Sequence, residues 1–342
     1  MNLRNEYLNN SPVETIYIGG GTPSLIHEAD LRSIINAIYQ HFRVSENVEF
    51  TMEANPEQCT SDYLKNLKNI GVNRLSIGIQ SLNNQILDYL GRKHTAEMAI
   101  DAVENACKAG FDNISLDLIY GIPLRSTQQW IEELQKALKL PIQHLSAYAL
   151  TIEENSILIK RFQKEGTPFH YGKDQDEDLA LRDFKTLLSI IEESPLNQYE
   201  ISNFAIPGFE SIHNSNYWNG TPYLGLGPSA HSFNSHSRCW NKASIKQYIE
   251  TMNSSEPVLE CEELSNINRF NEAILLGLRT IKGINLTDIQ KKFGEVLFHQ
   301  LLRNIELLNP EWYQLVQDRF SLSQEGLFLA DFISEKLFVT ED

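Results

Sequence analysis

Cysteine is scarce in this sequence, and no two cysteines are close neighbours. The four thiols are Cys59, Cys107, Cys239 and Cys261, and none of them belongs to a C-x-x-C pair. A zinc site or a disulfide framework needs clustered or regularly spaced cysteines, so neither is expected. We expect four free thiols in a reducing cytoplasm.

Long apolar runs and an excess of positive charge are also missing. No apolar stretch approaches the ~18 residues that a membrane helix needs, and the polar start Met1–Leu8 is unlike a signal peptide. The 45 acidic residues outnumber the 29 basic ones, which gives a formal net charge of −16. This balance disfavours binding to the phosphate backbone of nucleic acids. We therefore expect a cytoplasmic protein with no membrane span and no nucleic-acid partner.

The first half of the chain repeats a unit of an apolar run, a polar turn and an amphipathic stretch. Five such runs begin about 25 to 40 residues apart, the spacing of strands in βα units. They are Thr15–Ile18, Val48–Met52, Arg74–Ile79, Ile114–Ile119 and His144–Leu150. Glu28–Ile38 and Thr60–Leu67 have apolar residues at helical spacing, and Gly71 and Gly110 are expected to end helices. This order predicts an α/β fold with a parallel sheet or barrel.

Polar residues follow the ends of these runs. In parallel α/β folds, ligand-binding groups collect at the carboxyl ends of the strands. The glycines after the first run leave backbone N–H groups uncovered, and a buried carboxylate such as Glu53 or Asp117 must be solvated or paired. An ordinary turn, a salt bridge or a solvated charge could explain each residue alone, whereas together they predict one ligand site. The residues are Gly20, Gly21, Thr22, Glu53, Asn55, Pro56, Gln80, Ser81, Asp117, Tyr120, Gly121, Tyr148 and Thr151. Arg92 lies on a following segment and could reach the same edge, with a solvated surface charge as its alternative.

Five motifs in this region resemble one protein family. They are GGGTP at 19–23, EANP at 53–56, NRLSIGIQS at 73–81, LGRKH at 90–94 and LDLIYGIP at 116–123. In this order they resemble the radical S-adenosylmethionine (SAM) family of oxygen-independent coproporphyrinogen III oxidases and their haem-chaperone relatives. The similarity continues through HLSAY at 144–148 and YEISNFA at 199–205, so it covers nearly the whole chain.

The resemblance implies a SAM pocket at the strand ends. Gly20, Gly21 and Thr22 would hold the methionine amino and carboxylate groups and neighbouring parts of SAM. The pocket would be completed by Glu53, Gln80, Arg92, Asp117 and the segment around Ala149. These residue types suit the ligand, because SAM offers an ammonium group and ribose hydroxyls to acceptors and a carboxylate to donors.

The family's cluster motif is missing from the sequence. C-x3-C-x2-C supplies three thiolates to a [4Fe–4S] cluster and belongs upstream of the glycine turn, but Cys59 is the only thiol before residue 100. The resemblance therefore implies a partial (β/α)6-type radical SAM barrel without its first βα unit. We expect truncation rather than natural loss, because Met1–Leu8 resembles the end of the helix that follows the cluster loop. As written, the sequence cannot cleave SAM reductively.

The second half changes character after Thr151. A polar stretch at Lys160–Glu177 precedes a predicted helix at Leu179–Ile191, and Gln198–Asn203 is predicted to be a strand that closes the parallel series. The chain then ends in predicted helices at Phe270–Arg279, Leu286–Phe293 and Val296–Leu308, followed by a hairpin and a helix as in a winged helix. We expect a partial barrel over 1–205, a connecting segment over 206–262 and a small C-terminal helical domain over 263–342.

The connecting segment carries HNSNYW at residues 213–218. A histidine near two aromatic residues can ligate haem iron while the rings pack on the porphyrin, although a loop histidine is more often a surface residue. The run matches the H-N-x-x-Y-W motif of the haem-chaperone branch, so the resemblance implies haem contact for His213, Tyr217 and Trp218. His231 is a second candidate, with a simple turn as its alternative.

These features favour a radical SAM-type haem chaperone, which binds haem as cargo and passes it to a haem-accepting protein, including a membrane-associated one. The first alternative is an oxygen-independent coproporphyrinogen III oxidase of porphyrin biosynthesis. The second is a non-catalytic remnant that binds SAM weakly or not at all. The H-N-x-x-Y-W motif and the chain length fit the chaperone better, and whether the chain is an enzyme stays open.

Overall fold

The computed structural model describes residues 4, 6–151, 174–252 and 259–340. The chain divides into two compact units. One unit comprises Thr15–Arg32 and Glu49–Glu210, and the other comprises Met1–Glu14, Ser33–Val48 and Ser211–Asp342. The three-part division expected from the sequence stays a prediction. Most of the polar stretch Lys160–Glu177 lies outside the described residues.

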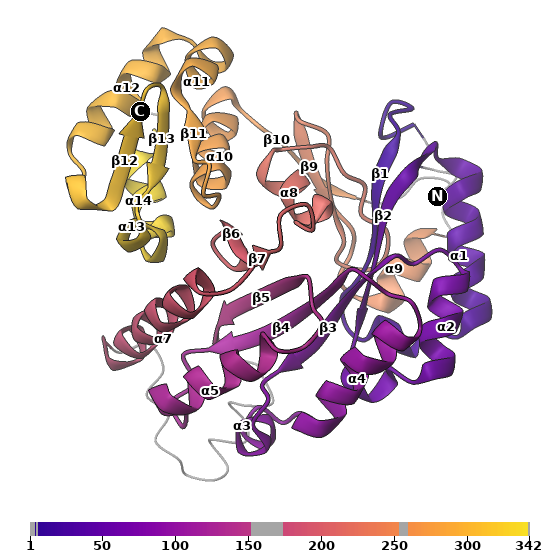
Figure 1. Ribbon diagram of the computed structural model, residues 1–342. Helices are drawn as coiled ribbons and strands as arrows, with labels where there is room; N and C mark the ends of the chain where they lie inside the picture. The colour runs from indigo at the N-terminus through magenta and orange to yellow at the C-terminus, as the bar shows by residue number, and fades with distance from the viewer. Residues whose placement is uncertain (1–3, 5, 152–173, 253–258, 341–342) are drawn as a thin grey trace. The chain divides into compact units, whose positions relative to one another are not determined.

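A seven-stranded sheet of order β1-β2-β3-β4-β5-β7-β6 organises the first half of the chain. Strands β2 to β5 pair in parallel and in sequence order, which confirms the predicted α/β class and its five strands. Figure 1 shows them as a curled sheet with helices on its outer side. The bounds are β1 Val13–Ile18, β2 Val44–Ala54, β3 Arg74–Gln80, β4 Ile114–Tyr120 and β5 His144–Ala149.

The predicted closing strand at Gln198–Asn203 is wrong, because a turn divides it and the strand that pairs with β5 is antiparallel. Strands β6 (Asn197–Glu200) and β7 (Asn203–Ala205) form a hairpin, and β7 pairs antiparallel with β5. Only Ile201 and Ser202 separate β6 from β7. A parallel pair needs a crossover of a dozen or more residues, so this short turn forces the chain to reverse.

The helices between the strands begin and end where local signals place them. Thr60, Thr95 and Ser126 cap α2, α4 and α5 by accepting a backbone N–H. Gly71 and Gly110 follow α2 and α4 with φ of +98° and +89°, which confirms them as helix-ending glycines. The bounds are α1 Glu28–His41, α2 Ser61–Asn69, α3 Asn84–Tyr89, α4 Ala96–Lys108, α5 Thr127–Ala137 and α7 Asp174–Glu192.

Alternation along the parallel strands gives the sheet two chemically different faces. Leu75, Ile77, Leu116 and Leu118 are fully buried, and α4 packs against β3 on the outer side of the sheet. Successive side chains of a strand point to opposite faces, so the residues between these leucines and isoleucines share the other face. That face is polar and carries Glu53, Arg74, Ser76, Ser115, Asp117, His144 and Ser146.

A buried ion network joins α5 to α7. The Arg125 guanidinium donates to Glu133 Oε2 at 3.0 Å and to Asp183 Oδ2 at 3.4 Å, and all three side chains are buried. It also lies 3.9 Å from the centroid of the Trp130 ring, whose Nε1 donates to the Asp183 carbonyl at 2.9 Å. Arg182, which is half-exposed, lies 3.3 Å from the other Asp183 oxygen, so Arg125 is the buried cation shared by both carboxylates and the cation paired with Glu133.

Replacing this cation should destabilise the protein strongly. Arg125→Met leaves the buried Glu133 without a countercharge and Asp183 with Arg182 alone, and breaking a buried pair in this way typically costs about 3–5 kcal/mol. Arg32→Met is the matched control, since Arg32 pairs with Glu28 on the surface and should change stability by less than about 0.5 kcal/mol. Urea unfolding followed by circular dichroism compares the two, and equal midpoints would contradict the role of the network.

The C-terminal residues form helices around a small sheet of order β11-β13-β12. The predicted helices and hairpin are present, and Gly294, with φ of +86°, separates α11 from α12. Their bounds are α9 Ile245–Met252, α10 Asn266–Leu278, β11 Ile284–Asn285, α11 Leu286–Phe293, α12 Glu295–Glu306, β12 Tyr313–Val316, β13 Arg319–Leu322, α13 Gln324–Phe328 and α14 Ala330–Leu337.

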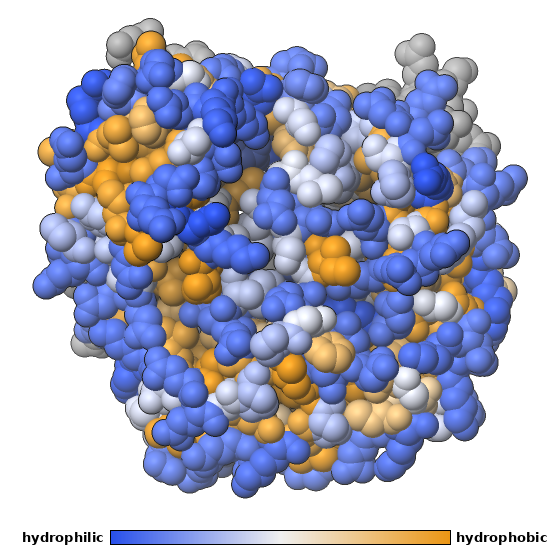
Figure 2. Space-filling model, turned by 45° about the horizontal axis from the view of Figure 1, so that its top comes forward, coloured by the Kyte–Doolittle hydropathy of each residue, from blue (hydrophilic) through white to orange (hydrophobic). Residues whose placement is uncertain are grey.

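Apolar side chains of this region reach the surface. Val296 and Leu307 are 81% and 85% exposed, and Figure 2 shows apolar patches on the left of the view. Trp312 and Phe332 line a cavity of about 510 Å³.

Within the described residues, we find no helix that combines the length and apolarity needed to cross a bilayer.

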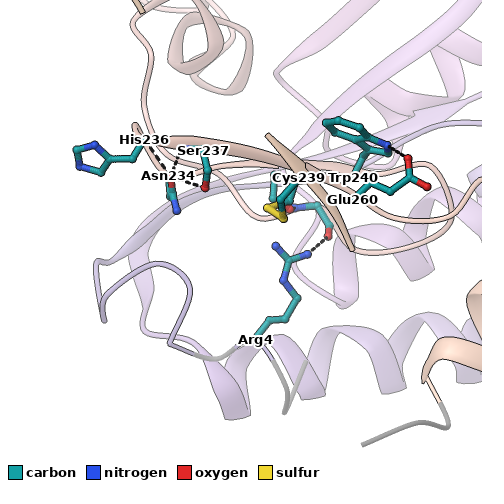
Figure 3. Close-up of a disulfide and its surroundings, with 10 residues drawn as sticks. Arg4, Asn234, His236, Ser237, Cys239, Trp240 and Glu260 are labelled. Carbon is teal, nitrogen blue, oxygen red and sulfur yellow. Dashed lines mark hydrogen bonds between the residues drawn. A yellow bond between two sulfur atoms is a disulfide. The ribbon is translucent and has the colours of Figure 1, made fainter. Parts of the chain in front are cut away.

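A three-stranded antiparallel sheet lies between α8 Ile212–Trp218 and α10 in the sequence. It consists of β8 His231–Phe233, β9 Ser237–Trp240 and β10 Glu260–Glu263. Cys239 and Cys261 face each other across β9 and β10 and form a disulfide, which Figure 3 shows near the hydrogen bond from Trp240 to Glu260. The expectation of four free thiols is therefore wrong. Strand register, which cysteine spacing does not reveal, brings this pair together.

Candidate functional site

The glycine turn at the end of β1 is open. Gly20 and Gly21 are exposed, with φ of +82° and +63°, and a Cβ added at either would meet nothing within 4 Å. Positive φ favours glycine, and the open space leaves the backbone accessible to a ligand. Gly20 N–H donates to Glu53 Oε2 at 2.9 Å, so the turn is tied to the end of β2.

Both oxygens of Glu53 are held by the protein. Gly20 N–H binds Oε2, and the Tyr17 hydroxyl donates to Oε1 at 2.7 Å. Burial raises the pKa of Tyr17, and the neighbouring Glu53 carboxylate raises it further, so the phenol stays protonated as a donor. Sequence reasoning missed Tyr17. The signal was its position between Ile16 and Ile18, which places it on the opposite face of β1 from the buried Ile16.

Asp117 lies on the same polar face, two strands away. The Ser76 hydroxyl is 3.1 Å and 3.3 Å from the two Asp117 oxygens, and Asp117 pairs in register with Ser146 of β5. Burial raises the pKa of Asp117 to about 6; the Ser76 bond lowers it and the Glu53 carboxylate raises it. Glu53 and Asp117 therefore repel each other, as two carboxylates that face one site.

A β-bulge at the end of β3 sets the orientation of Gln80. The β3–β4 register shifts between Ile77 and Gln80, and Gln80 has a φ of +63° in the left-handed region. Gly78 leaves room for this side chain, because a Cβ there would lie 2.8 Å from Gln80 Nε2. The buried His94 supports the bulge through its Nε2, which is 2.9 Å from the Ile79 carbonyl and must donate to it.

The remaining predicted residues lie at the same end of the parallel strands. Burial lowers the pKa of Arg92, whereas the charges of Glu57 and Asp117 raise it, so Arg92 lies within electrostatic reach of Asp117. Ala149 is exposed at the end of β5, and Thr22 begins the short 3-10 helix Pro23–Leu25. The structure thus brings the predicted residues to one end of the sheet, while their binding roles stay predictions.

The cysteines do not fit an iron–sulfur cluster. Burial raises the pKa of Cys59 to about 12, and burial also raises that of Cys107, so neither is a ready thiolate ligand. Cys239 and Cys261 are joined to each other. Across the described ranges, no three His, Cys, Asp or Glu side chains are grouped to hold a metal ion.

A second group of candidate residues forms a row of rings in the other unit. His213 and Tyr217 lie one turn apart on α8 Ile212–Trp218, and His213 Nε2 shares a 3.2 Å hydrogen bond with the Tyr217 hydroxyl. Ring centroids are 4.8 Å apart for Tyr217 and Tyr223, and 6.1 Å for Tyr223 and Phe233. We call these four residues the aromatic row. The assumption that His213 lies in a loop is wrong, because the Ser211 hydroxyl caps a helix there.

Trp218 and His231 occupy positions beside the row. Trp218 ends α8, which contacts α10, and the Arg279 guanidinium lies 5.9 Å from the Trp218 ring centroid. His231 begins β8, where its ring lies 6.1 Å from that of Trp240. The aromatic row, Trp218 and Arg279 thus present an imidazole, several flat rings and a cation within one unit.

Comparison with known proteins identifies the family to which this chain belongs. Residues 4–137 match the Radical SAM superfamily. The heme chaperone HemW of Lactococcus lactis is 32% identical over 333 residues, covering 96% of this chain and 86% of that protein. The chain belongs to the HemW family of radical SAM proteins. The Bacillus subtilis HemW is 33% identical over 86% of this chain and 77% of its own length.

A solved structure confirms the fold of this HemW-family chain. Coproporphyrinogen III oxidase HemN from Escherichia coli superposes with a TM-score of 0.79 and 19% sequence identity, covering 96% of this chain and 78% of that one. At this identity the likeness shows the fold alone. The partial radical SAM barrel and the C-terminal helical region expected for the family are therefore confirmed.

The raised pKa of Asp117 makes stability depend on pH. The folded-state pKa is about 6 against an ordinary value of 3.8, so the stabilisation by the protonated form is complete below about pH 4 and is lost as the pH rises through 6. Asp117→Asn cannot ionise and should stabilise the protein by about 1–3 kcal/mol near pH 7.5, with little effect near pH 4. Urea unfolding at both pH values measures this.

The control for this prediction is Asp112→Asn, which changes an exposed carboxylate just before β4. It should leave stability nearly unchanged at both pH values. If Asp117→Asn shifted stability equally at both, ionisation of Asp117 would not be the cause.

Proposed function

We propose that this protein is a haem chaperone, which binds haem at the aromatic row and passes it to a haem-accepting protein. The observation that carries the proposal is the imidazole of His213 at one end of a row of flat rings. Imidazole is a common axial ligand of haem iron, and aromatic rings pack on porphyrin faces. Bacterial relatives that match 86–96% of this chain carry the name heme chaperone HemW, which supports the same function.

Tyr217 would regulate access to the His213 nitrogen. Burial raises the pKa of Tyr217, and the neighbouring Tyr223 raises it further, so its hydroxyl stays neutral and can share a proton with His213 Nε2. Iron ligation by Nε2 requires this hydroxyl to turn away. The bond is between partly exposed groups, so breaking it costs little. Haem release would re-form it.

We also infer that SAM binds at the carboxyl ends of β1 to β5, because the donors and acceptors there suit it. SAM would supply a sulfonium nucleoside joined to an amino acid. Glu53 and Asp117 would accept hydrogen bonds, Arg92 and Gln80 would donate them, and the open backbone of Gly20 and Gly21 would let the ligand approach. Thr22 and Ala149 would complete the pocket. Hydrogen-bond donors on SAM would lower the pKa of Asp117.

The oxidase alternative has weaker support. The likeness to coproporphyrinogen III oxidase is a likeness of fold, whereas bacterial relatives at 31–33% identity carry the chaperone name. A cytoplasmic location, the recipient of haem and its association with a membrane stay predictions.

Haem titration tests the proposal directly. The protein should give a saturable Soret band, and His213→Ala should weaken haem affinity by about tenfold or more through loss of a ligand. His299→Ala is the matched control, since His299 is exposed on α12 and pairs with Glu295. His231→Ala separates the second candidate ligand from the first.

The spectra discriminate between the outcomes. An unchanged Soret band in His213→Ala and a lost one in His231→Ala would move the ligand to His231. The absence of any saturable band in the unaltered protein would refute haem binding.

A further inference from the structure

Two guanidinium groups border the proposed haem site. Arg279 lies 5.9 Å from the centroid of the Trp218 ring, and Arg238 lies 5.7 Å from that of Phe233. Rings beside fixed cations suit a ligand that is flat and apolar in its middle and anionic at its edge. Haem has this chemistry, because its porphyrin plane carries two propionate groups.

The same tryptophan carries an unused donor. Among the described residues, Trp218 Nε1 is buried and has no hydrogen-bond partner. A buried N–H group without a partner is unfavourable and rare in folded proteins. An acceptor on a ligand would satisfy it. The unused indole N–H and the neighbouring Arg279 cation both call for a carboxylate.

The acidic partners of the two arginines differ in exposure. Arg238 pairs with Glu272, whose side chain is 17% exposed, and a second carboxylate, Glu262, lies 3.9 Å away. Arg279 pairs with Asp331, whose side chain is 72% exposed. Exposed ion pairs contribute little to stability, so an incoming carboxylate can replace Asp331 more readily than Glu272.

Helix α10 carries Arg279 at its C-terminal end and, two turns earlier, Glu272, the partner of Arg238 on β9. Glu272, which holds Arg238, and Arg279, the C-cap of α10, are seven residues apart. Seven residues make two helical turns, so the two lie on one face about 10 Å apart. The negative end of the helix dipole favours a cation at the Arg279 position. Since α8 contacts α10, the guanidinium is held against Trp218 by the fold.

We propose that Arg279, together with Trp218 Nε1, binds a propionate carboxylate of haem. This carboxylate takes the place of Asp331 at the Arg279 guanidinium, and the Asp331 side chain moves into solvent. This inference rests on the proposed haem site. The exchange replaces one ion pair by another, so no charge is left buried and unpaired. Arg238 keeps Glu272 and stays a structural residue of the unit.

Two probes and four variants test the exchange. The probes are haem and haem dimethyl ester, in which both carboxylates are blocked, each titrated in the same detergent-containing buffer. The unaltered protein should prefer haem by about fivefold, and Arg279→Gln should remove the preference. Trp218→Phe keeps a ring but loses the N–H, so it should reduce the preference. Arg303→Gln, an equal change of charge on α12, should leave it unchanged.

Asp331→Asn separates ligand binding from a structural role. It removes the competing carboxylate, so it should strengthen haem binding about twofold to fivefold and leave the ester unaffected. If Arg279 only stabilised the fold through Asp331, Asp331→Asn and Arg279→Gln would weaken binding alike, and the proposal would be refuted. Because Asp331 is exposed, Asp331→Asn should fold normally. Its titration therefore tests the proposal even if Arg279→Gln misfolds.

The remaining outcomes keep the two proposals apart. Equal affinity of the unaltered protein for haem and its ester refutes propionate binding, whereas a Soret band that still depends on His213 leaves the chaperone function supported. A protein that binds neither probe contradicts the haem site itself.

Discussion

The two-residue alternation of the parallel strands is the constraint on which the first unit depends. One face of β3 and β4 must be apolar because helices bury it, and Leu75, Ile77, Leu116 and Leu118 meet that demand. The other residues of each strand are thereby free to be polar, and strand register lines them up across the sheet, as Glu53 with Ser76 and Asp117 with Ser146 show. The candidate SAM site is built on this second face.

The two carboxylates on the polar face, Glu53 and Asp117, differ in their hydrogen bonds and in their desolvation. Glu53 has a donor on each oxygen, from Tyr17 and Gly20, so its orientation is set before any ligand arrives. Asp117 has Ser76 but is desolvated and faces the charge of Glu53, which is why its pKa is raised to about 6. Glu53 is thus a pre-oriented hydrogen-bond acceptor, and Asp117 is a carboxylate whose charged form a ligand's hydrogen-bond donors would stabilise. This pairing suits ligand binding.

The second unit relies on side-chain contacts between elements far apart in sequence. The row from His213 to Phe233 ends near Arg238, whose pairing with Glu272 ties β9 to α10. The disulfide between Cys239 and Cys261 joins β9 to β10 in the same region. The surroundings of α8 are therefore held by an ion pair and a covalent bond, whereas the Arg279 pair with Asp331 is exposed and exchangeable.

The sequence by itself determined the five strands of the first half, the helices between them, their glycine ends and the clustering of Glu53 and Asp117, because periodicity and strand-end position are local signals. It did not reveal the antiparallel return of β7, the disulfide, or the contacts of Tyr17 and Arg279. Those depend on which residues of distant segments come to face each other. Only strand register and helix packing decide that, and neither leaves a pattern within one segment of chain.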